Sequence, residues 1–158
     1  MSQAKKDQVV DILAHGLMNF VNATGDKEMM KLATIVLRDV LDVFVEHIKA
    51  DDTCAFAFPG MAIPPDIQAE CFVECFVAIL NDRVIVAWRR GLFRKKTVIL
   101  VIGKHTIKQA SWAVVNRPGV TRGDAVLLTI IANETIVIAL PKDKPAVANA
   151  ILLAIQAK

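Results

Sequence analysis

The sequence predicts an α+β protein in which an N-terminal helical hairpin precedes an antiparallel β-barrel capped by a C-terminal helix. Up to about residue 50, apolar residues recur every three to four positions, the spacing of one helix face. From about residue 69 the chain holds β-branched runs separated by short turns. Charge changes at the same place, from a net −4 over residues 1–66 to a net +7 over residues 67–158. We therefore expect a helical hairpin over residues 1–50, an apolar linker over 51–68 and a barrel domain over 69–158.

The composition is strongly apolar: 54% of the residues are hydrophobic, and the mean hydropathy is +0.45. The uncharged stretches Thr53–Pro65 and Pro145–Ala157 are shorter than the roughly 20 residues that span a bilayer. Lys5 and Lys6 are followed by Asp7 rather than by an apolar run, so no secretory signal is expected. These features predict a cytoplasmic protein, with peripheral attachment to the inner membrane face as the alternative.

The first fifty residues predict two antiparallel helices. Apolar side chains repeat at helical spacing from Val9 to Val21, and Gly25 suits the left-handed position that ends a helix. Asp26 can cap a second helix that runs to about Ala50. The apolar stripe of this second helix is wider than one partner helix requires, so we expect the hairpin to pack on a further surface.

Residues 51–66 are expected to form the apolar linker, and the barrel domain is expected to begin at residue 69, so the linker region is taken as 51–68. Asp51 and Asp52 stop the helix, and Pro59-Gly60 and Pro64-Pro65 punctuate the segment that follows. Its apolar residues predict that it lies against the domain.

Six strands and a closing helix are predicted from the remaining sequence. Hairpin-length connections between the strands indicate antiparallel pairing. The predicted strands are Cys71–Leu80, Arg83–Arg89, Lys96–Ile102, His105–Val115, Ala125–Ala132 and Thr135–Leu140, and the closing helix is Lys144–Gln156.

Several of these strands are apolar on both faces, most clearly Lys96–Ile102 and Ala125–Ala132. One face can fill a barrel core, but the other would be exposed unless something covers it. The helical hairpin and a second subunit are the two coverings that the sequence allows. The sequence therefore predicts either a helix-covered sheet or an oligomer.

The segment Asn81–Lys96, with the sequence NDRVIVAWRRGLFRKK, resembles the opening of bacterial pleckstrin-homology-like domains, which also look like GRAM domains. In that family a polar-Asp-Arg turn precedes an apolar strand, and a basic hairpin with a glycine follows. Ala125–Leu140 looks like the last hairpin of the family, and Asp143–Ala157 looks like its closing helix. The resemblance covers residues 69–157.

The resemblance implies a binding module, often oligomeric, without a catalytic centre. It also implies seven strands where we count six, so either His105–Val115 splits in two or an element is missing. The N-terminal helices are not part of the family pattern.

The basic hairpin is the predicted ligand- or membrane-binding site. In lipid-binding relatives the equivalent loop holds phosphate groups with basic residues while apolar residues at its tip enter the interface. Cations near an anionic surface contribute about 1 kcal/mol each. The alternative is a solvated hairpin rim that keeps an apolar sheet soluble. The candidate residues are Trp88, Arg89, Arg90, Leu92, Phe93, Arg94, Lys95 and Lys96.

Other classes of function lack their motifs in this sequence. The basic residues could contact nucleic acid phosphates, but the net charge of +3 is modest and no nucleic-acid-reading motif is present. The usual nucleotide-binding, hydrolase and zinc-protease motifs are absent too. Cys54, Cys71 and Cys75 are an odd number with no paired spacing, which predicts free thiols rather than disulfides or a metal site. We therefore expect that the protein is not an enzyme and that it binds neither a cofactor nor nucleic acid.

The leading expectation is a non-catalytic module that self-associates or binds a protein partner through its doubly apolar sheet. Peripheral binding to anionic membranes through Arg89–Lys96 is the alternative.

Overall fold

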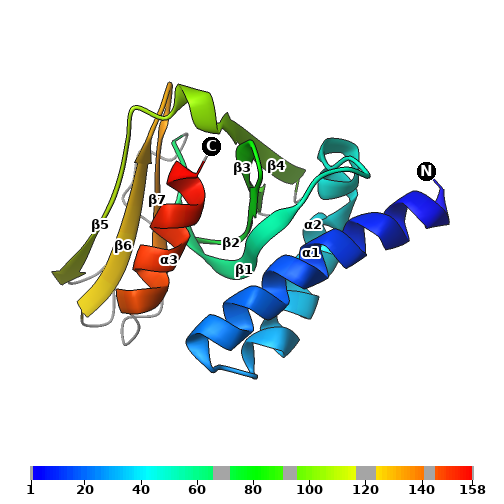
Figure 1. Ribbon diagram of the computed structural model, residues 1–158, viewed down its shortest axis with the longest axis horizontal. Coiled ribbons are helices and arrows are strands. Elements are labelled where there is room, and N and C mark those ends of the chain that lie inside the picture. The colour runs from blue at the N-terminus through cyan, green and yellow to red at the C-terminus, as the bar shows by residue number, and fades with distance from the viewer. Residues whose placement is uncertain (1, 66–71, 91–95, 117–123, 141–144, 158) are drawn as a thin grey trace.

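The computed structural model describes residues 2–65, 72–90, 96–116, 124–140 and 145–157. It contains three α-helices, a short 3-10 turn and seven strands (Figure 1). This architecture confirms the α+β class and the expected order of helical hairpin, sheet and closing helix. In chain order the elements are α1 (Gln3–Thr24), α2 (Met29–His47), β1 (Cys54–Ile63), β2 (Val73–Leu80), β3 (Arg83–Arg90), β4 (Lys96–Gly103), η1 (Lys104–Thr106), β5 (Gln109–Asn116), β6 (Asp124–Ile131), β7 (Thr135–Leu140) and α3 (Pro145–Gln156).

The ends of the helical hairpin follow from local capping. The Ser2 hydroxyl accepts a hydrogen bond from the Lys5 N–H at the start of α1. Gly25 ends α1 with a φ of 71°, and its N–H donates to the Val21 carbonyl at 2.8 Å, as expected for a left-handed cap. The Asp26 carboxylate accepts from the Glu28 N–H just before α2 begins. That second helix ends at His47, slightly before the predicted end at Ala50.

The seven strands form one antiparallel sheet in the order β4-β3-β2-β1-β7-β6-β5. Strands β4 and β5 lie at its two edges, so the sheet is open and curled. The prediction of a closed barrel is therefore wrong. The alternation of side chains tells which face of a strand is buried, but it is the same in a closed barrel and in a curled sheet.

The predicted linker is also wrong, because residues 54–63 form β1 at the centre of the sheet. This strand pairs with β2 over most of its length and with β7 only from Met61 to Ile63. Pro59 therefore lies where β1 has a ladder partner on one side only, and its missing N–H is tolerated there. β1 brings the number of strands to seven, so the missing element lay in the supposed linker and not in a split of residues 105–115.

The other strands lie close to their predicted positions. Residues 104–106 form the 3-10 turn, and β5 begins only at Gln109, so the prediction that a strand starts at His105 is wrong. β2 is described from Val73, and Cys71 lies outside the described residues.

The doubly apolar strands are explained by two cores, one on each side of the sheet. On the concave side, α3 packs mainly against β5 and β6, with Ile151 in the same core as residues such as Leu128 and Ile138. On the convex side, α1 and α2 cover the β1–β3 half, with Phe44 in edge-to-face contact with Phe76. Figure 1 shows α3 between the two halves of the curled sheet and the helical hairpin outside β1–β4. The hairpin thus covers its own sheet.

Helix α1 crosses β1 at very short range, and Gly16 is the residue at the crossing. A Cβ at this position would lie 2.5 Å from the Cys54 Sγ and 2.9 Å from the Ala57 nitrogen. Both distances are shorter than van der Waals contact, so a residue without a side chain is required here.

Candidate functional site

The described part of the basic hairpin places its cations at the ends of β3 and β4. Arg89, Arg90 and Lys96 are exposed there. An Arg89 Nη1 lies 3.9 Å from an Asp39 Oδ1 of α2, so this guanidinium sits over the helical hairpin. Four more of the candidate residues, Leu92, Phe93, Arg94 and Lys95, lie outside the described residues.

Trp88 does not share this surface. Its side chain is only 3% exposed and belongs to the concave core. Neighbouring residues of a strand point to opposite faces, which places Trp88 on the inner face of β3 and Arg89 on the outer face. Trp88 therefore belongs to the core and not to the predicted binding site. This residue has no surface from which to contact a membrane or a ligand outside the fold.

A second candidate surface is the convex face of the other half of the sheet. Where β1, β7, β6 and β5 run side by side, residues opposite one another share a face. One row across the strands is Met61, Ala139, Leu127 and Ala113, and the next is Ile63, Val137, Thr129 and Ser111. The third row is Thr135, Ile131 and Gln109. We call these eleven residues the uncharged grid, because none of them is acidic or basic.

Most of the uncharged grid is accessible although it is mostly apolar, and Leu127 is its buried member, at 6% exposure. Met61 is 42% exposed, Ala113 and Ser111 are exposed, and Val137 is half-buried. The apolar residues of α3 face the concave side, and α1 and α2 cover the β1–β3 half. Figure 1 shows the convex side of β5–β7 without a described helix over it. The helical hairpin therefore covers only one half of the doubly apolar sheet.

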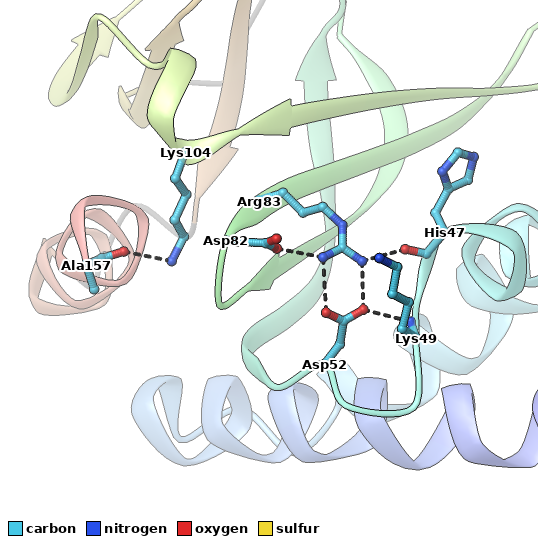
Figure 2. Close-up of polar contacts among 7 residues, drawn as sticks. All are labelled: His47, Lys49, Asp52, Asp82, Arg83, Lys104 and Ala157. Atoms are coloured by element: carbon cyan, nitrogen blue, oxygen red, sulfur yellow. Dashed lines mark hydrogen bonds and ion pairs between the residues drawn. The ribbon is translucent and has the colours of Figure 1, made fainter.

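A pocket of about 670 Å³ lies where α1, the start of β1, the β2–β3 turn and the end of α3 meet. Its polar lining includes Asp11 and His15 of α1, Asn81 of the turn, and Lys104. The Lys104 ammonium donates to the Ala154 carbonyl at 2.8 Å and to the Ala157 carbonyl at 3.1 Å, which satisfies the last turn of α3 (Figure 2). Burial lowers the pKa of Lys104, and nearby Asp82 opposes this effect.

Arg83 closes the neighbouring corner of the fold through a bidentate ion pair. Its Nη1 and Nη2 donate to the two Asp52 carboxylate oxygens at 3.0 and 2.7 Å, and Nη2 also donates to the His47 carbonyl at 2.6 Å (Figure 2). Asp82 accepts a further bond from Nη1 at 2.6 Å. The hydrogen bond from Arg83 holds the pKa of Asp52 below its usual range although burial opposes it. One guanidinium thus ties β3 to the end of α2 and to the segment before β1.

The sequence reasoning missed this corner. Asp52 was read only as a helix stop, and Asp82-Arg83 only as part of a turn motif. No local spacing links Asp52 to Arg83, since the two residues are brought together by the packing of α2 and β3. The signal available was weak: an arginine directly after a turn, and an acidic pair at the start of the predicted linker.

The two described cysteines are buried and unpaired. Burial raises the pKa of both the Cys54 and the Cys75 thiol to about 12. Both side chains are therefore protonated at neutral pH and are poor nucleophiles and poor metal ligands.

Comparison of the chain with protein-family models, curated proteins and solved structures gave no match. Among the described residues, no group of three or more His, Cys, Asp or Glu side chains is arranged to hold a metal ion. No described helix is both long and apolar enough to cross a bilayer. Function is therefore inferred from the surfaces of the chain itself.

Proposed function

We propose that the protein is a non-catalytic, pleckstrin-homology-like interaction module that self-associates through the uncharged grid. Seven antiparallel strands and a helix packed into the concave side fit the architecture that the resemblance implies. The uncharged grid is the single observation that carries self-association. Its eleven residues offer no acidic or basic side chain to attract a charged partner, and Glu74 of β2, opposite Met61, lies at its border.

A second copy is the occupant that the charge pattern favours. In a two-fold interface the same patch meets itself, so a charge near the axis would face its own copy. The eleven residues of the uncharged grid avoid that repulsion. With strands about 4.8 Å apart and rows about 6.7 Å apart, the grid has a flat area of roughly 400 Å². Stable interfaces usually bury about 800 Å² per partner, so we expect a concentration-dependent dimer.

Replacing Ala113 by lysine should weaken this dimer. The substitution places a cation on an exposed position of the uncharged grid, where dimerisation would have to bury it against a mostly apolar surface. We expect sedimentation velocity over a range of concentrations to show a monomer–dimer equilibrium for the wild type, with dimerisation at least tenfold weaker for Ala113→Lys.

Val114→Lys is the matched control, because it adds the same charge to the same strand on the opposite face. Val114 is 58% exposed, so the lysine can reach water. The control should dimerise as the wild type does. A wild type that stays monomeric at the highest soluble concentration would rule out self-association, and equal effects of both lysines would place the interface elsewhere.

Binding to anionic membranes is the second candidate function. The observation that favours it is the exposure of Arg89, Arg90 and Lys96 where β3 ends and β4 begins. At about 1 kcal/mol per cation, replacing all three by alanine should lower partitioning onto anionic vesicles more than about tenfold. Co-flotation with phosphatidylserine-containing and neutral vesicles, at low and moderate salt, measures this.

Replacing Lys5, Lys27 and Lys31 by alanine is the control, since it removes the same charge from the helical hairpin. This control variant should still float with anionic vesicles, and salt should weaken the binding. If the wild type floats with neither kind of vesicle, the membrane function is excluded. If both triple variants lose binding equally, only net charge matters and the β3–β4 hairpin is not the site.

A further inference from the structure

Strand β4 is one edge of the sheet, and it is a regular edge. It pairs with β3 at eight consecutive positions without a bulge, from Arg83↔Gly103 to Arg90↔Lys96. No described strand pairs with its other side. The outward N–H and C=O groups of β4 therefore form a straight row with the spacing that an added strand requires.

The side chains of this edge lack the usual protection against strand addition. Natural edges carry lysine, proline, inward-pointing charges or bulges. From Thr97 to Ile102 β4 has none of these over six residues. Most of the β3 side chains are buried, whereas Val98, Ile99 and Leu100 are only half-buried and Val101 is 40% exposed. The edge thus leaves apolar area that an additional strand would cover.

A groove runs beside the C-terminal half of the same edge. It has a volume of about 290 Å³ and lies between Leu100–Ile102 on one side and Thr106 and the β6–β7 turn, residues 132–134, on the other. Among the described residues that line it, only Glu134 is charged. A backbone edge, an apolar strip and one carboxylate therefore lie together.

The size of the groove distinguishes between possible occupants. Spread along three strand residues, about 10 Å, a volume of 290 Å³ leaves a cross-section of roughly 30 Å². One strand in a packed sheet occupies roughly 48 Å², so the groove has room for at most one extended chain. A second copy that paired through its own β4 would bring its β3 another 4.8 Å or so further out, against the β6–β7 turn. A single extended segment fits this space better than a second sheet does.

We propose that the β4 edge is a strand-addition site for an extended segment of a partner protein. The segment pairs its backbone with β4, places alternate apolar side chains on the face of Ile99 and Val101, and carries a lysine or arginine beside Glu134. In such complexes the main chain supplies affinity and the pockets for alternate side chains supply specificity. This site is separate from the uncharged grid and does not depend on self-association.

The opposite edge is a poorer site of this kind. β5 carries polar Gln109, Ser111 and Asn116, and the Trp112 indole N–H donates to Asn149 of α3 at 2.7 Å. The Trp112 side chain of β5 is therefore already bonded to the helix on the concave side. This difference makes β5 a suitable control.

A phage-displayed library of random twelve-residue peptides, panned on the wild type and depleted on Val101→Lys, tests the proposal. We expect enriched peptides with apolar residues at every second position and one lysine or arginine. A synthetic enriched peptide should bind Val101→Lys at least tenfold more weakly than the wild type and Val114→Lys within about twofold. Amide hydrogen exchange should slow in β4 when the peptide is bound, and not in β5.

Glu134→Gln checks the charge preference. This substitution should weaken binding of the enriched peptide severalfold. It should not change binding of the same peptide with its basic residue replaced by alanine. Failure to enrich any peptide over the depleted pool would overturn the proposal, as would protection of β5 instead of β4. A wild-type dimer that Val101→Lys disrupts and Val114→Lys does not would show that a second copy occupies the edge, which also overturns it.

Discussion

Replacing Gly16 by alanine should destabilise the protein by about 3 kcal/mol, at the upper end of the usual effect of overpacking. In a solvent-exposed helix the same substitution would stabilise by roughly 0.5–1 kcal/mol, because glycine is a poor helix former. Here the added methyl group meets the Cys54 Sγ at 2.5 Å, the Ala57 nitrogen at 2.9 Å and the Phe56 carbonyl carbon at 3.0 Å. Two of these are backbone atoms of β1, so α1 must move away from the sheet. Urea unfolding measures the loss.

Ala14→Gly is the matched control on the same helix. Ala14 is exposed, so this change should cost only about 1 kcal/mol of helix propensity. The preference between glycine and alanine thus reverses within two residues. The double variant Gly16→Ala/Cys54→Ala removes the nearest atom and should recover part of the loss, since the two backbone contacts remain. If Gly16→Ala stabilises the protein instead, α1 does not lie this close to β1.

The helices and most strands could be predicted because their determinants are local. Gly25 marks the end of α1 because only a residue without a Cβ adopts a φ of 71° easily. Thr135–Leu140 was predicted at its observed bounds, since β-branched residues and a short turn specify a hairpin. Sequence patterns of this kind predict an element without reference to what packs on it.

Strand β1 could not be predicted in this way. Pro59 and Gly60 are typical of a break in structure, and they are tolerated only because β7 pairs with β1 beyond them. That condition concerns a strand some eighty residues away in the chain. The same limit applies to barrel closure, because strand periodicity contains no information about whether β4 meets β5.

The candidate sites show the same division between local and long-range information. Apolar residues on both faces of the strands predicted that something covers the sheet, and the helical hairpin does so over β1–β3. That the β5–β7 half is left uncovered depends on where α1 and α2 dock. Alternation along β3 and the size of the Trp88 side chain both favour the core for this residue, although the predicted binding site included it with Arg89–Lys96.

Breaking the Arg83–Asp52 pair is the second large effect that we expect. The side chains of Arg83 and Asp52 are only 14% and 6% exposed, so removing one partner leaves a poorly hydrated charge. Arg83→Leu should therefore cost about 3–5 kcal/mol, because the Asp52 carboxylate loses its counter-charge and both guanidinium donors and keeps only the Lys49 N–H, at 2.7 Å. The double variant Arg83→Leu/Asp52→Asn should be less destabilised than the sum of the two single variants.

Asp82→Asn is the matched control at the same guanidinium. Asp82 also bonds Arg83 at 2.6 Å, but its side chain is 66% exposed and solvent screens the interaction. We expect a loss below about 1 kcal/mol. Comparable losses for Asp82→Asn and Arg83→Leu would mean that burial does not govern the strength of these contacts.

The pH dependence of stability isolates the contribution of Asp52. Its pKa is lowered in the folded protein, so its contribution is present above the pKa of an unfolded aspartate, about 3.9, and disappears as pH falls through the lower folded value. The stability difference between wild type and Asp52→Asn should therefore be largest near about pH 7 and shrink towards about pH 2, where the wild-type carboxyl is protonated too. Denaturant titrations across this range measure the difference. A stability difference that stays constant down to about pH 2 would show that the pair acts through packing and not through charge. A difference that disappears at acid pH would show that the ionised pair stabilises the corner where α2, β1 and β3 meet.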